Sequence, residues 1–281
     1  MIDLDLLIEQ ANELAPLPAS TVRLAALVDS PDCHLEDVAE LIAFDQALTV
    51  RLLRAANSAA SASALHVGTV QEAVMRMGTA QVLALAVACG AKPFLQARVT
   101  AYGLAEGALW RHSVAAAVAA EIALAFCEVE IPPEAFTAAL LHDIGKLVMG
   151  RFLSPEILGF IRRAQEVDHL GQLGAESLLL NVHHGELGGL IAQHWKLPPR
   201  VVQGIIHHHD PEQGLDPICD FTCLANHVAK RIEAGLDGVS FDAVLPAGVA
   251  PRLGLTDNGL DQLCPVAAMR YAQVRARYDV A

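Results

Sequence analysis

The chain contains few aromatic residues and no long uninterrupted apolar stretch. Aromatic side chains make up 5% of its 281 residues and alanine is abundant, a composition that favours closely packed helices over a β-sandwich or barrel. The most apolar stretch, residues 114–126, contains Glu121, so no run of about 18 charge-free apolar residues predicts a membrane span. The first ten residues carry acidic but no basic side chains and do not predict a signal peptide. We therefore expect a soluble, cytoplasmic protein.

Positive charge is also scarce. The sequence has 19 lysines and arginines against 32 aspartates and glutamates, which gives a net charge of −13 when the histidines are neutral. Such a chain is repelled by nucleic acid and by anionic membrane surfaces, so neither is expected as a direct partner. The six cysteines include no CxxC pair and are expected to be reduced, mostly buried thiols.

Apolar residues recur three and four positions apart through most of the chain. In LEDVAELIAFD, for example, Leu35, Val38 and Ile42 share one face of a helix. Further helices are predicted over residues 153–167, 173–198, 220–234 and 260–278, whereas residues 235–259 are rich in glycine, proline and aspartate and are predicted to form loops. No repeat or low-complexity linker separates these segments. We therefore expect one domain with two helical lobes, residues 1–100 and 101–281.

One segment combines an apolar helical pattern with polar side chains. EAFTAALLHDIGKLVMG, residues 134–150, follows two prolines, as helix starts often do, and is predicted to be a helix buried along most of its circumference. His142, Asp143 and Lys146 interrupt its apolar pattern. Polar side chains are costly on a buried helix unless they have partners, so these three indicate a site. A core histidine bonded to its neighbour would give the same dipeptide.

Histidines gather on the neighbouring predicted helices. His112 lies near the start of an alanine-rich helix, and six of the twelve histidines fall between residues 183 and 209. Imidazole and carboxylate groups suit zinc, iron, manganese or nickel, and helical bundles build metal sites from facing helices. Two non-metal roles stay open for these side chains. Each imidazole could be a satisfied core or surface group, and the three histidines at 207–209 could simply end a helix, where imidazolium suits the dipole.

Taken together, these motifs resemble a known family. His112 followed by His142-Asp143 in LLHDIGK resembles the metal-dependent HD phosphohydrolase superfamily, and the wider pattern is similar to its HDOD (HD-related output domain) signalling branch. The matching stretches include DVAELIAFDQALTVRLLRAANSA, VGTVQEAVMRMG, LWRHS, AFTAALLHDIGKL, HHGELGGLIAQHWKLP and IIHHHDP, in order, over roughly residues 14–211. The resemblance implies an all-α fold in which an N-terminal helical subdomain packs on an HD-like helical bundle.

The resemblance also implies roles for particular residues. One metal ion would be held by His112, His142 and Asp143, and Asp143 could bridge to a second ion. His184, His208 and His209 resemble the second-metal ligands of the related HD-GYP phosphodiesterases, and Lys146 would face a phosphate. The implied cofactor is one or two divalent transition-metal ions (iron, manganese, zinc or nickel), or none.

Two departures from the enzyme pattern bear on catalysis. HD enzymes end their site with an aspartate on a later helix, and the nearest counterpart here is Asn226, whose neutral amide is a weaker ligand. Asp220 could compensate, but it lies on another helical turn. The Gly-Tyr-Pro signature expected after the paired histidines is replaced by EQGLDPICD, so the motif does not support cyclic di-GMP hydrolysis.

Three functions remain open. The preferred one is a bacterial signal-transduction output module with a vestigial or non-catalytic metal site. Its protein partners would be a histidine kinase, a receiver or a transcriptional regulator on a separate chain, since no receiver-like βα alternation precedes it. The second is a metal-dependent phosphohydrolase of a nucleotide or other phosphoester, with Asp143 and Lys146 as catalytic residues. The third is a helical scaffold with chance histidines. A homo-oligomer is left open.

Overall fold

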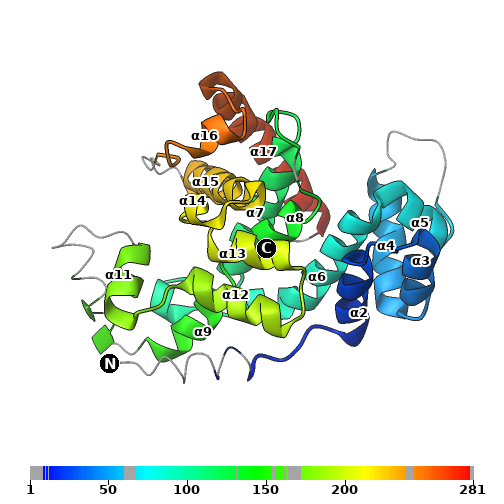
Figure 1. The fold of residues 1–281 in the computed structure, drawn as a ribbon, viewed down its shortest axis with the longest axis horizontal. Coiled ribbons are helices and arrows are strands. Elements are labelled where there is room, and N and C mark those ends of the chain that lie inside the picture. Colours follow the sequence, from blue (N-terminus) through cyan, green and yellow to red (C-terminus); the bar gives the residue numbers. More distant parts are fainter. Residues whose placement is uncertain are drawn as a thin grey trace.

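A computed structural model describes residues 13–59, 67–130, 132–153, 172–237 and 244–278, together with single residues within 9–11 and 156–163. In these residues the regular structure is helical and contains no strand, apart from one isolated bridge between Val99 and Leu104. Figure 1 shows a group of N-terminal helices, blue to cyan, packed beside a larger helical bundle. The prediction of an all-α fold with an N-terminal helical subdomain on a bundle is therefore confirmed.

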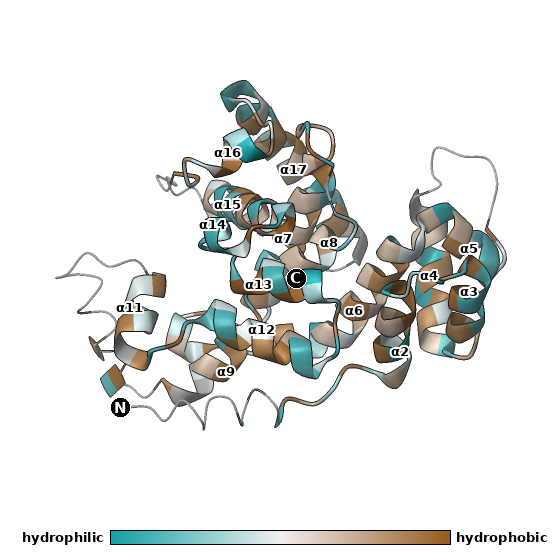
Figure 2. Ribbon diagram, in the orientation of Figure 1, coloured by the Kyte–Doolittle hydropathy of each residue, from teal (hydrophilic) through white to brown (hydrophobic). Residues whose placement is uncertain are grey.

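The N-terminal group is built from five helices that pack on one another. They are α2 (Ala19–Val28), α3 (Leu35–Ala43), α4 (Gln46–Ala59), α5 (Val70–Met77) and α6 (Thr79–Leu95). The helix α6 also contacts α7 and α8 of the bundle, and Figure 2 shows hydrophobic residues along it. Buried apolar residues of both groups belong to one continuous core, so α6 joins the groups through packing. A boundary at residue 100 stays a prediction.

The bundle is organised around α7 (Ala108–Ala123), which contacts α8 (Ala135–Leu141), α15 (Pro217–Asp237) and α17 (Asp257–Tyr278). Most of α7 is buried, and many of its buried residues are alanines, whose small side chains let three helices approach it. The predicted helices over residues 220–234 and 260–278 are parts of α15 and α17. Within the predicted loops at 235–259, the structure contains the short helix α16 (Val249–Arg252).

Two segments predicted as single helices are interrupted, and those two predictions were wrong. Residues 134–150 form α8 and then α9 (Gly145–Phe152), separated by a turn at residues 142–144. Residues 173–198 form α11 (Gln172–Leu180) and then α12 (His184–His194). Asn181 takes a left-handed conformation, φ 55°, which asparagine tolerates better than most residues, and it ends the run of α11.

Local hydrogen bonds fix where the later helices begin. His183 caps α12, since its imidazole accepts a hydrogen bond from the Gly185 N–H while Glu186 accepts one from the His183 N–H. Pro199 is the first residue of α13 (Pro199–Ile206), a position where its missing N–H costs nothing. A further short helix, α14 (Pro211–Gly214), precedes α15. The predicted helix over residues 153–167 falls largely outside the described residues.

None of the described helices is long and apolar enough to cross a membrane alone. Only α5 and α6 taken together pass such a test of length and composition, and they are bent by 108° where they meet.

A methyl group at Gly145 should destabilise the fold, because it would enter the backbone of α12. A Cβ built at Gly145 comes within 2.6 Å of the Gly188 nitrogen and 2.8 Å of the His184 carbonyl carbon. Overpacking of this kind costs about 1–3 kcal/mol and more where backbone cannot move. We expect Gly145→Ala to lower the free energy of unfolding in urea by at least about 2 kcal/mol.

Gly235→Ala is the matched control for this experiment. Gly235 is exposed within α15, and a Cβ built there has nothing within 4 Å. Alanine is favoured over glycine in helices by about 0.8–1.0 kcal/mol, so this variant should be slightly more stable than the wild type. If Gly145→Ala unfolded with the same urea midpoint as the wild type, the result would contradict the close packing of α9 on α12.

Candidate metal centre

The six predicted ligands come together at Asp143, which lies in the turn between α8 and α9. We call them the His/Asp centre: His112 on α7, His142 after α8, Asp143, His184 at the start of α12, and His208 and His209 after α13. The side chains fall into two groups that share Asp143, one on each carboxylate oxygen. The structure therefore places all six predicted residues in one location, while their role as metal ligands stays a prediction.

The first group, which we call the Oδ2 side, consists of His112, His142 and Asp143. The two Nε2 atoms are 3.2 Å apart, and each is 3.5 Å from Asp143 Oδ2. On the outer edge of each ring, Nδ1 of His112 lies 2.9 Å from Glu233 Oε2, and Nδ1 of His142 lies 2.7 Å from the Ala139 carbonyl oxygen. These oxygens accept hydrogen bonds, so each Nδ1 carries the proton and each Nε2 presents a lone pair inward.

The second group, which we call the Oδ1 side, consists of Asp143, His184, His208 and His209. Oδ1 of Asp143 lies 3.3 Å from His184 Nε2 and 3.8 Å from His208 Nε2, and His184 Nε2 lies 3.0 Å from His209 Nε2. Nδ1 of His208 donates to the Ile205 carbonyl oxygen at 2.7 Å, which again leaves Nε2 facing inward. Four candidate ligand atoms thus surround one position, the number that a tetrahedral site requires.

A buried carboxylate that sequence reasoning missed supports the Oδ1 side. Glu176 on α11 is fully buried and its Oε2 accepts hydrogen bonds from His184 Nδ1 at 2.7 Å and from the His184 N–H at 2.9 Å. Tyr102 donates to the other oxygen at 2.9 Å. Burial would raise the pKa of Glu176, but the bonds from His184 lower it. Carboxylate–histidine pairs of this kind orient metal ligands. The one available signal was a lone acid in the apolar sequence LGAESLLL.

The electrostatics of the centre fit a divalent cation. Burial lowers the pKa of His142 to about 3 and that of His209 to about 2, and it also lowers the pKa of His208, so these rings are neutral. Burial would raise the pKa of Asp143, but Lys146 and His142 hold it well below its usual range, so the carboxylate is ionised. Neutral imidazoles with an ionised carboxylate are the forms that bind metal, and His184, whose pKa the Asp143 and Glu176 carboxylates raise, must lose a proton to join them.

Two buried atoms give an independent indication of a cation. Asp143 Oδ1 and His208 Nε2 are buried without a hydrogen-bond partner among the described residues. Orphaned polar atoms of this kind are costly, and a metal ion would satisfy both. The facing Nε2 lone pairs of His112 and His142 would be stabilised in the same way. The donor set, imidazole with carboxylate, suits zinc, iron, manganese or nickel.

Lys146 and Asn226 differ in their relation to the centre. Lys146 Nζ donates to Asp143 Oδ2 at 2.6 Å. Asn226 is buried on α15, and its Oδ1 has no hydrogen-bond partner within the described parts of the chain. It stands four and seven positions before Lys230 and Glu233, so these three side chains share one helix face.

Asp220 does not replace the missing aspartate. The Arg252 guanidinium binds it through Nη2 at 2.7 Å and through Nε at 3.0 Å, away from the His/Asp centre.

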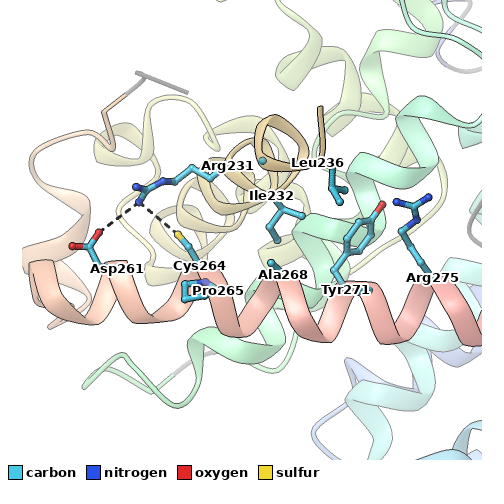
Figure 3. Close-up of a pocket in the computed structure, with 11 residues that line it drawn as sticks. Arg231, Ile232, Leu236, Asp261, Cys264, Pro265, Ala268, Tyr271 and Arg275 are labelled. Carbon is cyan, nitrogen blue, oxygen red and sulfur yellow. Dashed lines mark hydrogen bonds and ion pairs between the residues drawn. The ribbon is translucent and has the colours of Figure 1, made fainter. Parts of the chain in front are cut away.

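Two cavities also lie away from the His/Asp centre. One of about 530 Å³ is lined by residues such as Arg231, Cys264 and Tyr271 between α15 and α17 (Figure 3), and one of about 570 Å³ adjoins Phe44 in the N-terminal group. No described residue lining either of these cavities belongs to the centre.

The fold and the centre define a class of all-α proteins in which helices assemble histidines around one aspartate. The sequence matches the HDOD domain family over residues 14–211, which is more than half of the chain and contains the whole His/Asp centre. The chain therefore belongs to the HDOD domain family.

Solved structures share this fold. A candidate phosphohydrolase from Shewanella amazonensis SB2B is 27% identical with a TM-score of 0.64, over 95% of this chain and 93% of that one. An HDOD domain protein of unknown function from Geobacter sulfurreducens is 22% identical with a TM-score of 0.66, over 99% and 98%. A candidate signal transduction protein from Marinobacter aquaeolei VT8 is 22% identical with a TM-score of 0.71, over 97% and 61%.

A curated relative is longer than this chain. An uncharacterized protein of Treponema pallidum (strain Nichols) is 26% identical over 230 residues, which is 80% of this chain and 44% of the relative. The chain thus spans less than half the length of that relative.

In metal-free protein, the free energy of unfolding should fall as the pH is lowered from about 6.5 to about 4. The pKa values of His142, His208 and His209 are lowered by burial, whereas histidines of the unfolded chain titrate near pH 6.5. In that window the unfolded chain binds more protons, so stability rises with pH by about 1 kcal/mol per pH unit for each such histidine. Urea unfolding in a chelator, repeated across this pH range, measures the slope.

His209→Gln serves as the control for this pH series, because it removes one of the histidines with a lowered pKa, which also include His183 and His227, and should make the slope shallower. For His184, burial lowers the pKa but the nearby Asp143 and Glu176 carboxylates raise it overall. Its contribution to stability is therefore lost only above pH 6.5 and does not cancel the slope. A stability that stays constant between pH 4 and 6.5 would show that these rings are not held neutral.

Proposed function

We propose that this chain is a signal-transduction output module of HDOD type, located in the cytoplasm, whose His/Asp centre binds divalent metal and whose output is protein contact rather than turnover. The observation that carries the proposal is the burial of most of the centre, in which His209 is the one partly exposed member. His142 and His208 are 0% exposed, and Asp143 and His184 are 1% exposed. A phosphoester hydrolase needs an open metal position with room for a phosphoryl group and water beside it.

The composition of the centre supports the same proposal. One carboxylate, Asp143, serves both groups of histidines, and Lys146 already neutralises its Oδ2. In the resemblance to HD enzymes, the neutral Asn226 is the nearest counterpart of the aspartate that ends their site. With a single carboxylate ligand, the centre is poorly equipped to hold the pair of ions that a two-metal phosphohydrolase uses.

Exposed apolar side chains provide surface for protein contacts. In the N-terminal group, Phe44 is 83% exposed, Met75 58% and Val50 55%. Aromatic residues and methionine are enriched at protein interfaces, and this group lies apart from the His/Asp centre. We propose that a histidine kinase, a receiver or a transcriptional regulator binds there.

A metal-dependent phosphohydrolase is the second candidate, and the shared Asp143 favours it. A carboxylate between two sets of imidazoles is the arrangement by which a two-metal hydrolase holds its ions. Bound ions would lower the pKa of a water molecule and polarise a phosphoryl group. Asp143 would hold them and the Lys146 ammonium would stabilise developing negative charge. The name of the Shewanella relative, at 27% identity, points the same way.

A turnover assay separates the two candidates. Protein without a histidine tag, loaded with manganese, iron or zinc, is offered p-nitrophenyl phosphate, bis-p-nitrophenyl phosphate and cyclic dinucleotides. We expect rates no higher than those of Asp143→Asn, because most of the centre is buried and leaves little room for a substrate. Hydrolysis that is at least about tenfold faster than in Asp143→Asn, a difference of about 1.4 kcal/mol in the barrier, would favour the hydrolase instead.

A bacterial two-hybrid screen tests the protein contacts. The chain is paired with the kinases, receivers and transcriptional regulators of its own genome, and we expect at least one interaction that Phe44→Ser weakens. The matched control is Leu215→Ser, because Leu215 is a 93% exposed apolar residue outside the N-terminal group. Equal loss with both variants would place the contact elsewhere, and no interaction with any of these proteins would count against the proposal.

A further inference from the structure

The two oxygens of Asp143 are in different states. Oδ2 accepts a hydrogen bond from the Lys146 ammonium at 2.6 Å. Oδ1 is buried without a well-formed hydrogen bond among the described residues, and its nearest neighbour in the centre is His184 Nε2 at 3.3 Å. A cation that binds Oδ1 satisfies an orphaned atom, whereas a cation that binds Oδ2 must first displace a charged lysine.

The ligand sets on the two sides also differ. The Oδ1 side offers three imidazoles and a carboxylate, a closed four-coordinate set. The Oδ2 side offers two imidazoles and the other oxygen of the same carboxylate. Asn226, on the α15 face that carries Lys230 and Glu233, has only a neutral amide to add. The Oδ1 side is therefore the stronger site for a transition-metal ion.

Lys146 is held in its position by more than one contact. Its Nζ lies 5.8 Å from the centroid of the Tyr102 ring, within reach of a cation–π interaction, and its side chain is only 12% exposed. Tyr102 is fixed in turn by its hydrogen bond to Glu176. The ammonium group is thus a fixed part of the Oδ2 side and not a mobile surface charge.

The charge around the centre sets how many ions it tolerates. Asp143, Glu176 and Glu233 bring three negative charges to the centre and its outer bonds, while Lys146 and the largely buried Lys230 bring two positive ones. With His184 neutral, as metal binding requires, one divalent ion turns this net charge from −1 to +1, whereas a second would make it +3. An uncompensated buried charge of that size is strongly unfavourable.

We propose that the centre binds a single divalent ion on the Oδ1 side, through Asp143, His184, His208 and His209, and that the Lys146 ammonium occupies the place of a second ion on the Oδ2 side. This inference rests on the proposed metal-binding role of the centre. It assigns the ion to the Oδ1 side and not to the His112/His142 pair. It also gives Lys146 a structural role in the site.

Metal titration of selected variants tests this assignment. Tag-free protein is stripped with chelator, titrated with Zn²⁺ in a calorimeter, and its metal content measured after desalting. We expect about one ion per chain, retained in His112→Gln, with affinity lowered at least about tenfold in His209→Gln. Loaded with Co²⁺, the wild type and His112→Gln should show the intense visible absorption of four-coordinate cobalt, and His209→Gln should lose it.

A double variant tests the role of Lys146 directly. Lys146→Met combined with Asn226→Asp frees Oδ2 and restores a carboxylate, so it should take up a second ion that His112→Gln then removes. Circular dichroism of every variant shows whether it is folded. If the double variant is not folded, Lys146→Met alone is titrated in its place.

Three results would overturn the assignment. The first is a wild type that binds two ions, and the second is an ion that is lost in His112→Gln but kept in His209→Gln. No metal uptake by the wild type would also overturn it, while leaving protein contact as the output to be judged by the two-hybrid screen. Turnover is measured separately, so failure of the proposed function and failure of this assignment give different results.

Discussion

The buried carboxylate of Asp143 has to be compensated, and the surrounding helices are placed so that it is. Burial alone would raise its pKa, yet Lys146, His142 and His184 hold that pKa well below the usual range. These partners lie on α9, after α8 and at the start of α12, so the ionised carboxylate is stable only when all three elements are docked. An uncompensated buried charge costs about 3–5 kcal/mol, a large share of the stability of any domain.

Close backbone approach makes this docking possible. The helix α12 carries glycine where it meets its neighbours: a Cβ at Gly188 would lie 2.8 Å from Ile205 Cγ2, and one at Gly185 would lie 2.9 Å from the Ile206 carbonyl oxygen. On α9, which packs against α12, Gly145 lets the start of the helix approach the His184 carbonyl. These glycines bring His184 to Asp143 from one direction and the end of α13, with His208, from another. The spacing of HHGELGG thus follows from packing.

The sequence predicted the centre better than it predicted the helices that build it. The grouping of these side chains was predictable because histidine and aspartate are unusual in buried helical patterns and because their order matched a known family. The breaks at residues 142–144 and 181–183 were not predictable from periodicity, since apolar residues at helical spacing resume directly after the polar residues at both. Glu176 and Glu233 were missed because each acts through a contact with a distant residue, His184 or His112, that only the tertiary structure creates.

Those two carboxylates extend the centre to elements that contribute no ligand. Glu176 on α11 holds both the ring and the backbone N–H of His184, and Glu233 on α15 holds the ring of His112. Histidines held in this way keep one tautomer and one orientation. The orientation of the histidine rings and the positions of α11 and α15 therefore depend on each other. Both helices reach the surface, where Leu178 and Leu236 are exposed. A hydrolase would need such rigidity around an open metal position. A largely buried centre that fixes the position of surface helices instead supports the proposal of a module recognised by another protein.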